Sequence, residues 1–189
     1  MTRWKPDAEA RLIKAAITLF DRQGYDETTV AQIAEAVGLT KRTFFRYFAD
    51  KREVLFSGSE QLESVWVEAV AAAPTGPSPL VLVAAGFGPI GDLFADRHPF
   101  ARMRAGVVAA NPELQERELI KLQNLAKAIA RALVDRGVDR NDAILAAQAG
   151  VTVFHVAFAR WVEQEQPAAF ARLLDASLRQ LRSVTAASS

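Results

Sequence analysis

Apolar residues recur with the spacing of α-helices along nearly the whole chain, and no stretch of useful length alternates as a β-strand does. The clearest case is residues 9–20, where apolar side chains stand at positions 12, 13, 16, 17 and 20. Side chains three and four positions apart lie on one face of a helix, so this pattern predicts an amphipathic helix. With 189 residues, half of them hydrophobic, the chain can bury the core of one or two small domains. We therefore expect an all-α protein.

Glycine, proline and capping residues divide this pattern into about nine helices. Gly24 and Gly38 can follow the first two, because glycine readily adopts the left-handed conformation found after helix C-termini. Thr29 offers a hydroxyl cap, with Gln32 three residues later to complete a capping box, and Thr40 can cap the next helix. After the first helix, the others are expected at about 30–37, 41–48, 51–73, 79–95, 100–110, 112–136, 140–164 and 168–183. The prolines at 74–79 and Pro167 mark the strongest breaks.

Residues 29–48 form a short helix, a four-residue turn and a second short helix. One apolar face unites the two helices, and Gly38 allows the chain to reverse between them. This arrangement predicts a helix-turn-helix, whose second helix enters the major groove of DNA. The residues expected on the shared apolar face are Ile33, Ala34, Val37, Leu39, Phe44 and Phe48.

The second short helix is locally basic although the chain is nearly neutral. Residues 40–52 contain five basic side chains and one acidic one, whereas the whole chain has 23 Lys and Arg against 22 Asp and Glu. The neutral total excludes a protein that coats nucleic acid uniformly, but a local basic face suits phosphates. Arg42 can contact guanine, Thr43 a base edge and Tyr47 a phosphate. The alternative at this point is a solvated basic helix on a small helical core.

Residues 7–56 resemble the DNA-binding domain of TetR/AcrR-type transcriptional regulators. The resemblance rests on the Thr-Val-Ala-Gln-Ile-Ala start at 29–34, the core at 37–53 and the Phe-x-x-Lys end at 48–51. It implies a three-helix helix-turn-helix domain at 1–56 and a larger helical domain for ligand binding and dimerisation at 57–189. The family usually has Tyr at the position of Phe45 and often His at that of Tyr47. The resemblance implies that the DNA is lined by Thr40, Lys41, Arg42, Thr43, Phe45, Tyr47 and Lys51. We also expect DNA contacts from Thr29 and Arg46 of the same segment.

The expected helix at 140–164 is apolar nearly all round between residues 143 and 159. A helix without a polar side must be buried on two sides, and this stretch is short for a membrane span. We expect its bulky face to meet the core and its small-residue face to meet a second copy, beside leucines of the last helix. The alternative is that both helices complete the core of a monomer. The expected dimer contacts are Ala146, Gly150, Val153, Ala157, Leu174, Leu178 and Leu181.

Bulky apolar residues on the middle helices, with a few polar interruptions, are the candidates for an effector cavity. Polar side chains in apolar stretches need partners if they are buried, and such a cavity suits a hydrophobic or amphipathic small molecule. Each apolar member taken singly fits plain core as well. The residues expected to bind the ligand are Trp66, Phe87, Phe94, Met103, Asn124, Gln148, Thr152 and Phe158.

Several classes of protein are excluded or not expected. The chain has no Cys, which excludes disulfides, thiol nucleophiles, zinc fingers and iron–sulfur clusters, and its two His make a multi-His metal site unexpected. No residue set resembles an active site, so we expect no enzyme, no cofactor and no metal. We also expect a cytoplasmic protein without signal peptide or membrane partner. The function indicated is a homodimeric repressor on a palindromic operator, released by a small-molecule effector. The alternative is an activator or an effector-independent regulator of the same fold.

Overall fold

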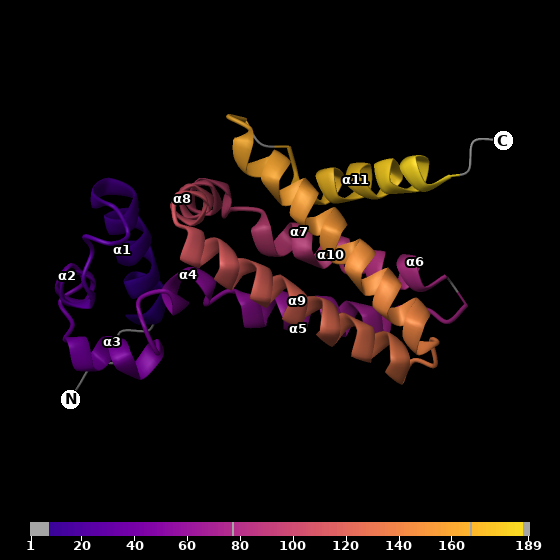
Figure 1. The fold of residues 1–189 in the computed structure, drawn as a ribbon, viewed down its shortest axis with the longest axis horizontal. Coiled ribbons are helices and arrows are strands. Elements are labelled where there is room, and N and C mark those ends of the chain that lie inside the picture. The colour runs from indigo at the N-terminus through magenta and orange to yellow at the C-terminus, as the bar shows by residue number, and fades with distance from the viewer. Residues whose placement is uncertain (1–7, 77, 167, 187–189) are drawn as a thin grey trace. The chain divides into compact units, whose positions relative to one another are not determined.

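A computed structural model describes residues 8–76, 78–166 and 168–186, and in these ranges it contains helices and no strands (Figure 1). The all-α prediction is confirmed. The expected breakers Pro77 and Pro167 lie outside the described residues. The helices are α1 (Ala8–Gln23), α2 (Val30–Glu35), α3 (Lys41–Tyr47), α4 (Glu53–Phe56), α5 (Ser59–Ala72), α6 (Pro79–Ala84), α7 (Phe87–Phe94), α8 (His98–Ala109), α9 (Pro112–Asp135), α10 (Arg140–Glu163) and α11 (Phe170–Thr185).

The described ranges hold more helical segments than the sequence predicts because two expected helices are each broken once. The helix expected at 51–73 is divided between α4 and α5, and the one expected at 79–95 is divided between α6 and α7. The second break lies at Gly86, where the ring of Trp66 occupies the space that a Cβ would need. Counted with each broken pair as one helix, the arrangement matches the expected nine.

The chain divides into two compact units. The first is formed by the residues up to Gly58 together with Phe100–Glu118, and the second by Ser59–Pro99 together with the residues from Leu119 onward. The helices α8 and α9 therefore each contribute residues to both units. A segment far along the chain thus belongs to the same compact unit as the helix-turn-helix.

The core of the first unit combines α1, α2, α3 and α4 with the segment 100–118. Leu12, Ile33 and Phe44 are fully buried at its centre. Leu114, from the distant segment, is equally buried in the same cluster. Met103 packs against this cluster as a partly buried side chain. Met103 was expected in the effector cavity, and this packing in the first unit corrects that expectation.

The second unit is built around α10, which packs against α6 and α11 (Figure 1). The helix α7 packs against both α5 and α11. Gly150 of α10 allows the close approach to α6, because a Cβ there would collide with Val83. Trp66 of α5 donates its indole N–H to the carbonyl of Val83 at 2.8 Å, which fastens α5 to α6. The small residues of α10 therefore serve packing within the chain.

Among the described residues, α10 is the one helix that is by itself long and apolar enough to cross a membrane. Length and composition alone do not distinguish such a span from the central helix of a soluble core. Nine residues of α10, among them Ala147, Phe154 and Trp161, are buried within this chain. This burial is what a core helix requires.

Candidate nucleic-acid interface

The first helix of the helix-turn-helix begins at the predicted capping box. The hydroxyl of Thr29 accepts a hydrogen bond from the backbone N–H of Gln32 at 3.3 Å, and the Gln32 side chain accepts one from the backbone N–H of Thr29 at 2.8 Å. Two N–H groups at the helix start are thereby satisfied. Gly38 then takes a φ of 70°, which glycine adopts without strain, and the chain turns into α3.

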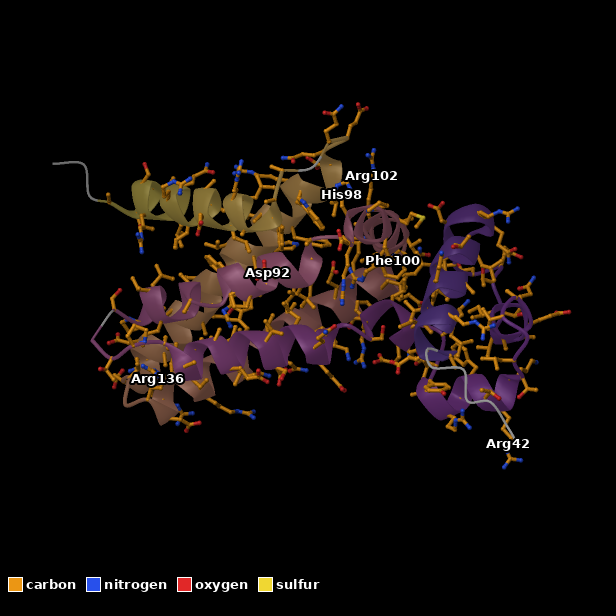
Figure 2. The ribbon with its side chains drawn as sticks, turned by 180° about the vertical axis from the view of Figure 1, so that it is seen from behind. Arg42, Asp92, His98, Phe100, Arg102 and Arg136 are labelled. Atoms are coloured by element: carbon orange, nitrogen blue, oxygen red, sulfur yellow. The ribbon has the colours of Figure 1, made fainter. Side chains whose placement is uncertain are left out.

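One side of helix α3 packs against the core of the first unit, and the other side is exposed to solvent. Thr40 caps it by accepting a hydrogen bond from the backbone N–H of Thr43 at 3.2 Å, and Phe44 is fully buried beneath it. Lys41 and Arg42 are exposed on the opposite side. Arg42 extends away from the helix into solvent (Figure 2). Neither forms an ion pair in the described part of the chain, so both are available to phosphates or base edges.

The end of α3 carries two aromatic residues with different surroundings. The ring of Phe45 is 54% exposed, and its edge-on contact with Phe44 covers only one side. The hydroxyl of Tyr47 accepts a hydrogen bond from Arg46 at 3.1 Å, and the guanidinium also lies 5.1 Å from the centre of the Tyr47 ring. This contact orients the cationic and phenolic groups together on the exposed side of α3.

Lys51 does not present free donors, contrary to the expectation from sequence. Its ammonium donates to the carbonyl oxygens of Tyr25 at 2.7 Å, Thr28 at 3.2 Å and Asp26 at 3.3 Å. It also lies 4.1 Å from the centre of the Tyr25 ring. An ammonium has three N–H donors, and here all three serve the turn between α1 and α2. The expected hydrogen bond from Lys51 to DNA is therefore corrected to a structural role.

Asp50 organises the start of α4. One carboxylate oxygen accepts hydrogen bonds from the backbone N–H groups of Arg52 at 2.8 Å and Glu53 at 3.1 Å, and the other pairs with the Arg52 guanidinium at 2.8 Å. Burial alone raises the pKa of Asp50, but these hydrogen bonds outweigh it and hold the pKa below its ordinary value. Because Arg52 is paired, the free positive charge of this region lies on α3.

The segment 100–118 supports α4 through contacts that the sequence analysis missed. Arg104 donates to the carbonyl oxygen of Leu55 at 2.7 Å and pairs with Glu118 at 2.7 Å. Arg117 pairs with Glu53 at 2.6 Å. The partners of Arg104 and Arg117 on α4 lie 49 and 64 residues away in sequence. No local pattern predicts such pairs, because nothing within a helix indicates a partner at that distance.

Four of the expected effector-binding residues belong to a packed aromatic cluster in the second unit. Phe94 lies 5.2–6.1 Å, between ring centres, from Phe154, Phe158, Trp161 and Phe170. Trp66 lies 5.8 Å from both Phe87 and Phe154. Rings at such distances are in direct contact. The expected aromatic residues Trp66, Phe87, Phe94 and Phe158 thus fill the interior of the second unit with one another.

The three polar residues expected in the cavity are exposed. Asn124 lies on the outer side of α9, and Gln148 and Thr152 lie on the outer side of α10. The hydroxyl of Thr152 bonds to the carbonyl oxygen of Gln148 within the helix, at 2.9 Å. A polar side chain in an apolar stretch can face solvent as well as a cavity. These three side chains therefore do not face the buried interior of the second unit, and of the three only Gln148 lines the groove described below.

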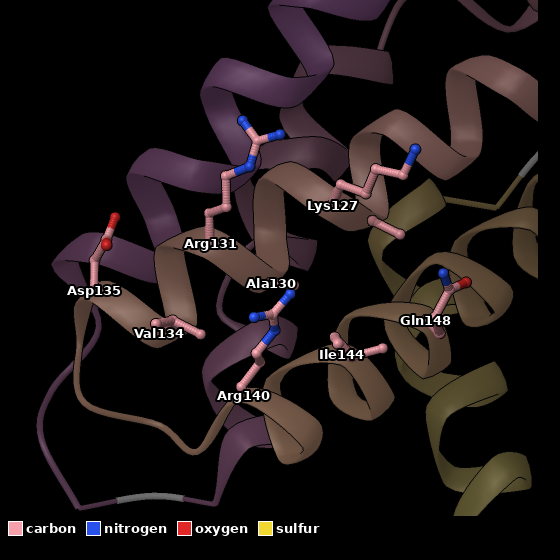
Figure 3. A pocket seen from close by; sticks show the side chains of 9 residues that line it. Lys127, Ala130, Arg131, Val134, Asp135, Arg140, Ile144 and Gln148 are labelled. Carbon is pink, nitrogen blue, oxygen red and sulfur yellow. The ribbon is translucent and has the colours of Figure 1, made fainter.

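A groove of about 370 Å³ lies elsewhere, between the last turns of α9 and the first turns of α10 (Figure 3). Its apolar lining includes Val134 and Ile144, and its basic lining is Lys127, Arg131 and Arg140. Gln148, which was expected in the effector site, also lines this groove. The groove could not be predicted from the sequence, because its residues come from two helices. Which sides of these helices face each other depends on how the helices pack.

Six of the seven expected dimer contacts are buried within the chain itself. Ala157 and Leu174 are fully buried, and only Leu181 is partly exposed. A side chain covered by its own chain offers little or no surface to a second copy, so this burial counts against these six contacts. The side of α10 that does remain exposed carries Leu145, which is 69% exposed, and Val156, which is 39% exposed. The six buried residues are Ala146, Gly150, Val153, Ala157, Leu174 and Leu178.

Comparisons with known protein families match both parts of the chain. The model for bacterial regulatory proteins of the tetR family matches residues 12–57, and the model for the MftR C-terminal domain matches residues 78–186. The HTH-type transcriptional regulator TcmR of Streptomyces glaucescens is 33% identical over 139 residues, which are 70% of this chain and 62% of that protein. The chain thus spans under two thirds of the length of this relative.

Solved structures of the same fold span nearly the whole chain. FadR of Thermus thermophilus, a TetR-family transcriptional repressor solved with lauroyl-CoA, covers 96% of each chain at 23% identity and a TM-score of 0.59. FadR of Bacillus subtilis, solved with stearoyl-CoA, covers 91% of this chain and 96% of its own at 19% identity and a TM-score of 0.56. The N-terminal match, the C-terminal match and the common fold agree. The chain belongs to the TetR family of DNA-binding transcriptional regulators.

Proposed function

We propose that this regulator is a homodimeric repressor that binds a palindromic operator and is released by a hydrophobic or amphipathic small molecule. The observation that carries the DNA-binding part is the exposed side of α3, where Lys41 and Arg42 have no acidic partner in the described residues. Arg46 and Tyr47 stand together at the end of the same helix. Such a regulator works where the chromosome is, in the cytoplasm of a bacterium.

The exposed side of α10 supports the homodimer. Leu145, Thr152 and Val156 lie along one side of this helix at spacings of seven and four residues, and all three are exposed. A side of a central helix on which two apolar side chains, Leu145 and Val156, are exposed on either side of a threonine is the kind of surface that a second copy covers. In the proposed dimer, two α3 helices would enter successive major grooves about 34–36 Å apart.

The two FadR structures, which contain acyl-CoA molecules, support an amphipathic effector as a proposal for this chain. The second candidate function is an effector-independent regulator of the same fold. The packed aromatic cluster around Phe94 favours it, because a ligand entering that interior would have to displace rings already in contact. Activation in place of repression depends on where the operator lies relative to the promoter.

The DNA-binding part is tested by selecting bound genomic fragments and measuring affinity by fluorescence anisotropy. We expect Arg42→Ala and Tyr47→Ala each to weaken binding roughly tenfold, the loss associated with one good base or phosphate contact. Arg179→Ala, an exposed arginine on α11, is the matched control and should leave affinity unchanged. Full affinity in both α3 variants would refute the assignment of the recognition helix.

The dimer is tested by sedimentation velocity at micromolar concentration. Leu145→Glu should shift the protein toward the 20.6 kDa monomer, because it places a charge in an apolar contact. Leu119→Glu, at a leucine of α9 that is 59% exposed, should leave the oligomeric state unchanged. A wild-type protein that sediments only as a monomer would defeat the proposed dimer. Transcription measured from a promoter carrying the selected operator distinguishes repression from activation.

A further inference from the structure

The groove between α9 and α10 combines an apolar floor with a basic lining (Figure 3). We propose that this groove binds the acidic group of a small amphipathic molecule, with the apolar part of the molecule against Val134 and Ile144. Its role as the effector site rests on the proposed function, whereas the binding itself does not. The volume of about 370 Å³ is within the range of small-molecule sites.

The charges around the groove are unbalanced. Lys127 and Arg131 stand one turn apart on α9, and Arg140 comes from the first turn of α10. In the described residues none of the three has an ion pair or a side-chain hydrogen bond, and Asp135 is the one acidic residue of the lining. Like charges one turn apart on a helix repel each other. A bound carboxylate or phosphate would relieve this repulsion and accept hydrogen bonds from the guanidinium groups.

The larger apolar side chains that line the groove are only partly covered by the rest of the chain. Val134 is 42% exposed and Ile144 is 43% exposed, so each leaves substantial apolar surface in contact with water. Ala126 and Ala130 also line the groove and are themselves buried. Figure 3 shows Arg140 directed between the two helices, toward Ala130. A ligand with an acidic end and a short apolar body would cover both kinds of surface at once.

A second copy of the chain is a poorer occupant. A two-fold contact made by this groove upon itself would bring its arginines opposite the same arginines of the partner, and like charges facing each other across an interface are unfavourable. The basic lining therefore favours a small anion over a copy of the same surface. The apolar strip through Leu145 and Val156 has no such concentration of charge.

The test is isothermal titration calorimetry of the full chain with four molecules that each contain an eight-carbon chain: octanoate, octyl phosphate, octanol and octyltrimethylammonium. We expect at least one of the two anions to bind and the cation not to bind, and comparison of octanoate with octyl phosphate identifies the preferred acidic group. The double variant Arg131→Gln/Arg140→Gln should weaken anion binding by roughly tenfold or more. Arg172→Gln/Arg179→Gln, with two exposed arginines of α11, is the matched control and should bind as the wild type does.

A charge reversal gives a readout that loss of folding would not produce. Arg131→Glu/Arg140→Glu should lose the anions and gain binding of octyltrimethylammonium. The proposal is overturned if neither anion binds the wild type, or if the anions bind the Gln double variant with unchanged affinity. It is also overturned if the Gln double variant dissociates a dimer in sedimentation, because a second copy would then occupy the groove. Operator binding by the same samples is read separately, so a failure of Arg42→Ala to weaken DNA binding would refute the proposed function alone.

Discussion

The guanidinium of Arg117 donates two hydrogen bonds, of 2.6 and 2.9 Å, to a single carboxylate oxygen of Glu53. Glu53 is the first residue of α4, and its backbone N–H donates to the carboxylate of Asp50 just before this helix. The pair therefore joins the beginning of α9 to the DNA-binding helices inside the first unit. The contact of Arg104 with Leu55 reinforces the same junction.

We expect Arg117→Met to lower the free energy of unfolding by about 1 kcal/mol, because the pair is only partly shielded from solvent. A double-mutant cycle with Glu53→Gln should give a coupling of about 0.5–1 kcal/mol from urea unfolding curves. Arg102→Met, at an exposed arginine of α8, is the control and should change stability by less than about 0.5 kcal/mol. A coupling of zero would show that the two side chains do not stabilise the junction.

Lys51, which is bonded within the chain, and Lys41, which is exposed, are expected to respond differently to substitution. Lys51→Met removes the donor to three carbonyl oxygens of the α1–α2 turn, and we expect a loss of about 1–2 kcal/mol in unfolding free energy. Lys41→Met should leave stability nearly unchanged and weaken operator binding, with a smaller dependence on salt concentration. Equal stability of the two variants would restore Lys51 to the DNA-contacting set.

Local signals explain why the helix-turn-helix could be predicted from sequence. The capping box of Thr29, the cap at Thr40 and the turn at Gly38 each involve residues only a few positions apart. Such local interactions can be predicted from a short stretch of sequence. The hydrogen bonds that Asp50 accepts at the start of α4 are equally local. The three carbonyl partners of Lys51 were missed because they lie 23 to 26 residues earlier in the chain.

The faces of α10 could not be assigned from sequence because the helix is apolar nearly all round. Size alone suggested that the small residues meet a second copy, yet Gly150 packs on Val83 of α6 and Leu145 remains exposed. Which side of such a helix is covered depends on the helices that pack against it. For the same reason a groove formed by Arg131 and Arg140 on two different helices has no signal in either one alone.

Acid titration should reveal the contribution of Asp50. Its pKa is held below the ordinary value of 3.8, so its stabilising effect is complete above that value and is lost as pH falls through the lower folded-state pKa. We expect Asp50→Ala to cost about 1 kcal/mol near pH 7, the usual loss when a helix start loses its side-chain acceptor. The difference from wild type should stay constant down to about pH 4 and shrink below it. Urea unfolding at a series of pH values measures this, and a difference that grew on acidification would contradict the assignment.

Two helical glycines separate the effect of packing from that of helix propensity. A Cβ at Gly150 would collide with the side chain of Val83, so we expect Gly150→Ala to lower the free energy of unfolding by about 1–3 kcal/mol. Gly106 lies in α8 with open space around the added Cβ, and Gly106→Ala should stabilise the protein by about 0.5–1 kcal/mol. Thermal and urea unfolding of both variants measure the contrast. If Gly150→Ala were as stabilising as Gly106→Ala, the close approach of α10 to α6 would be wrong, and the small residues of α10 would again be candidates for the dimer contact.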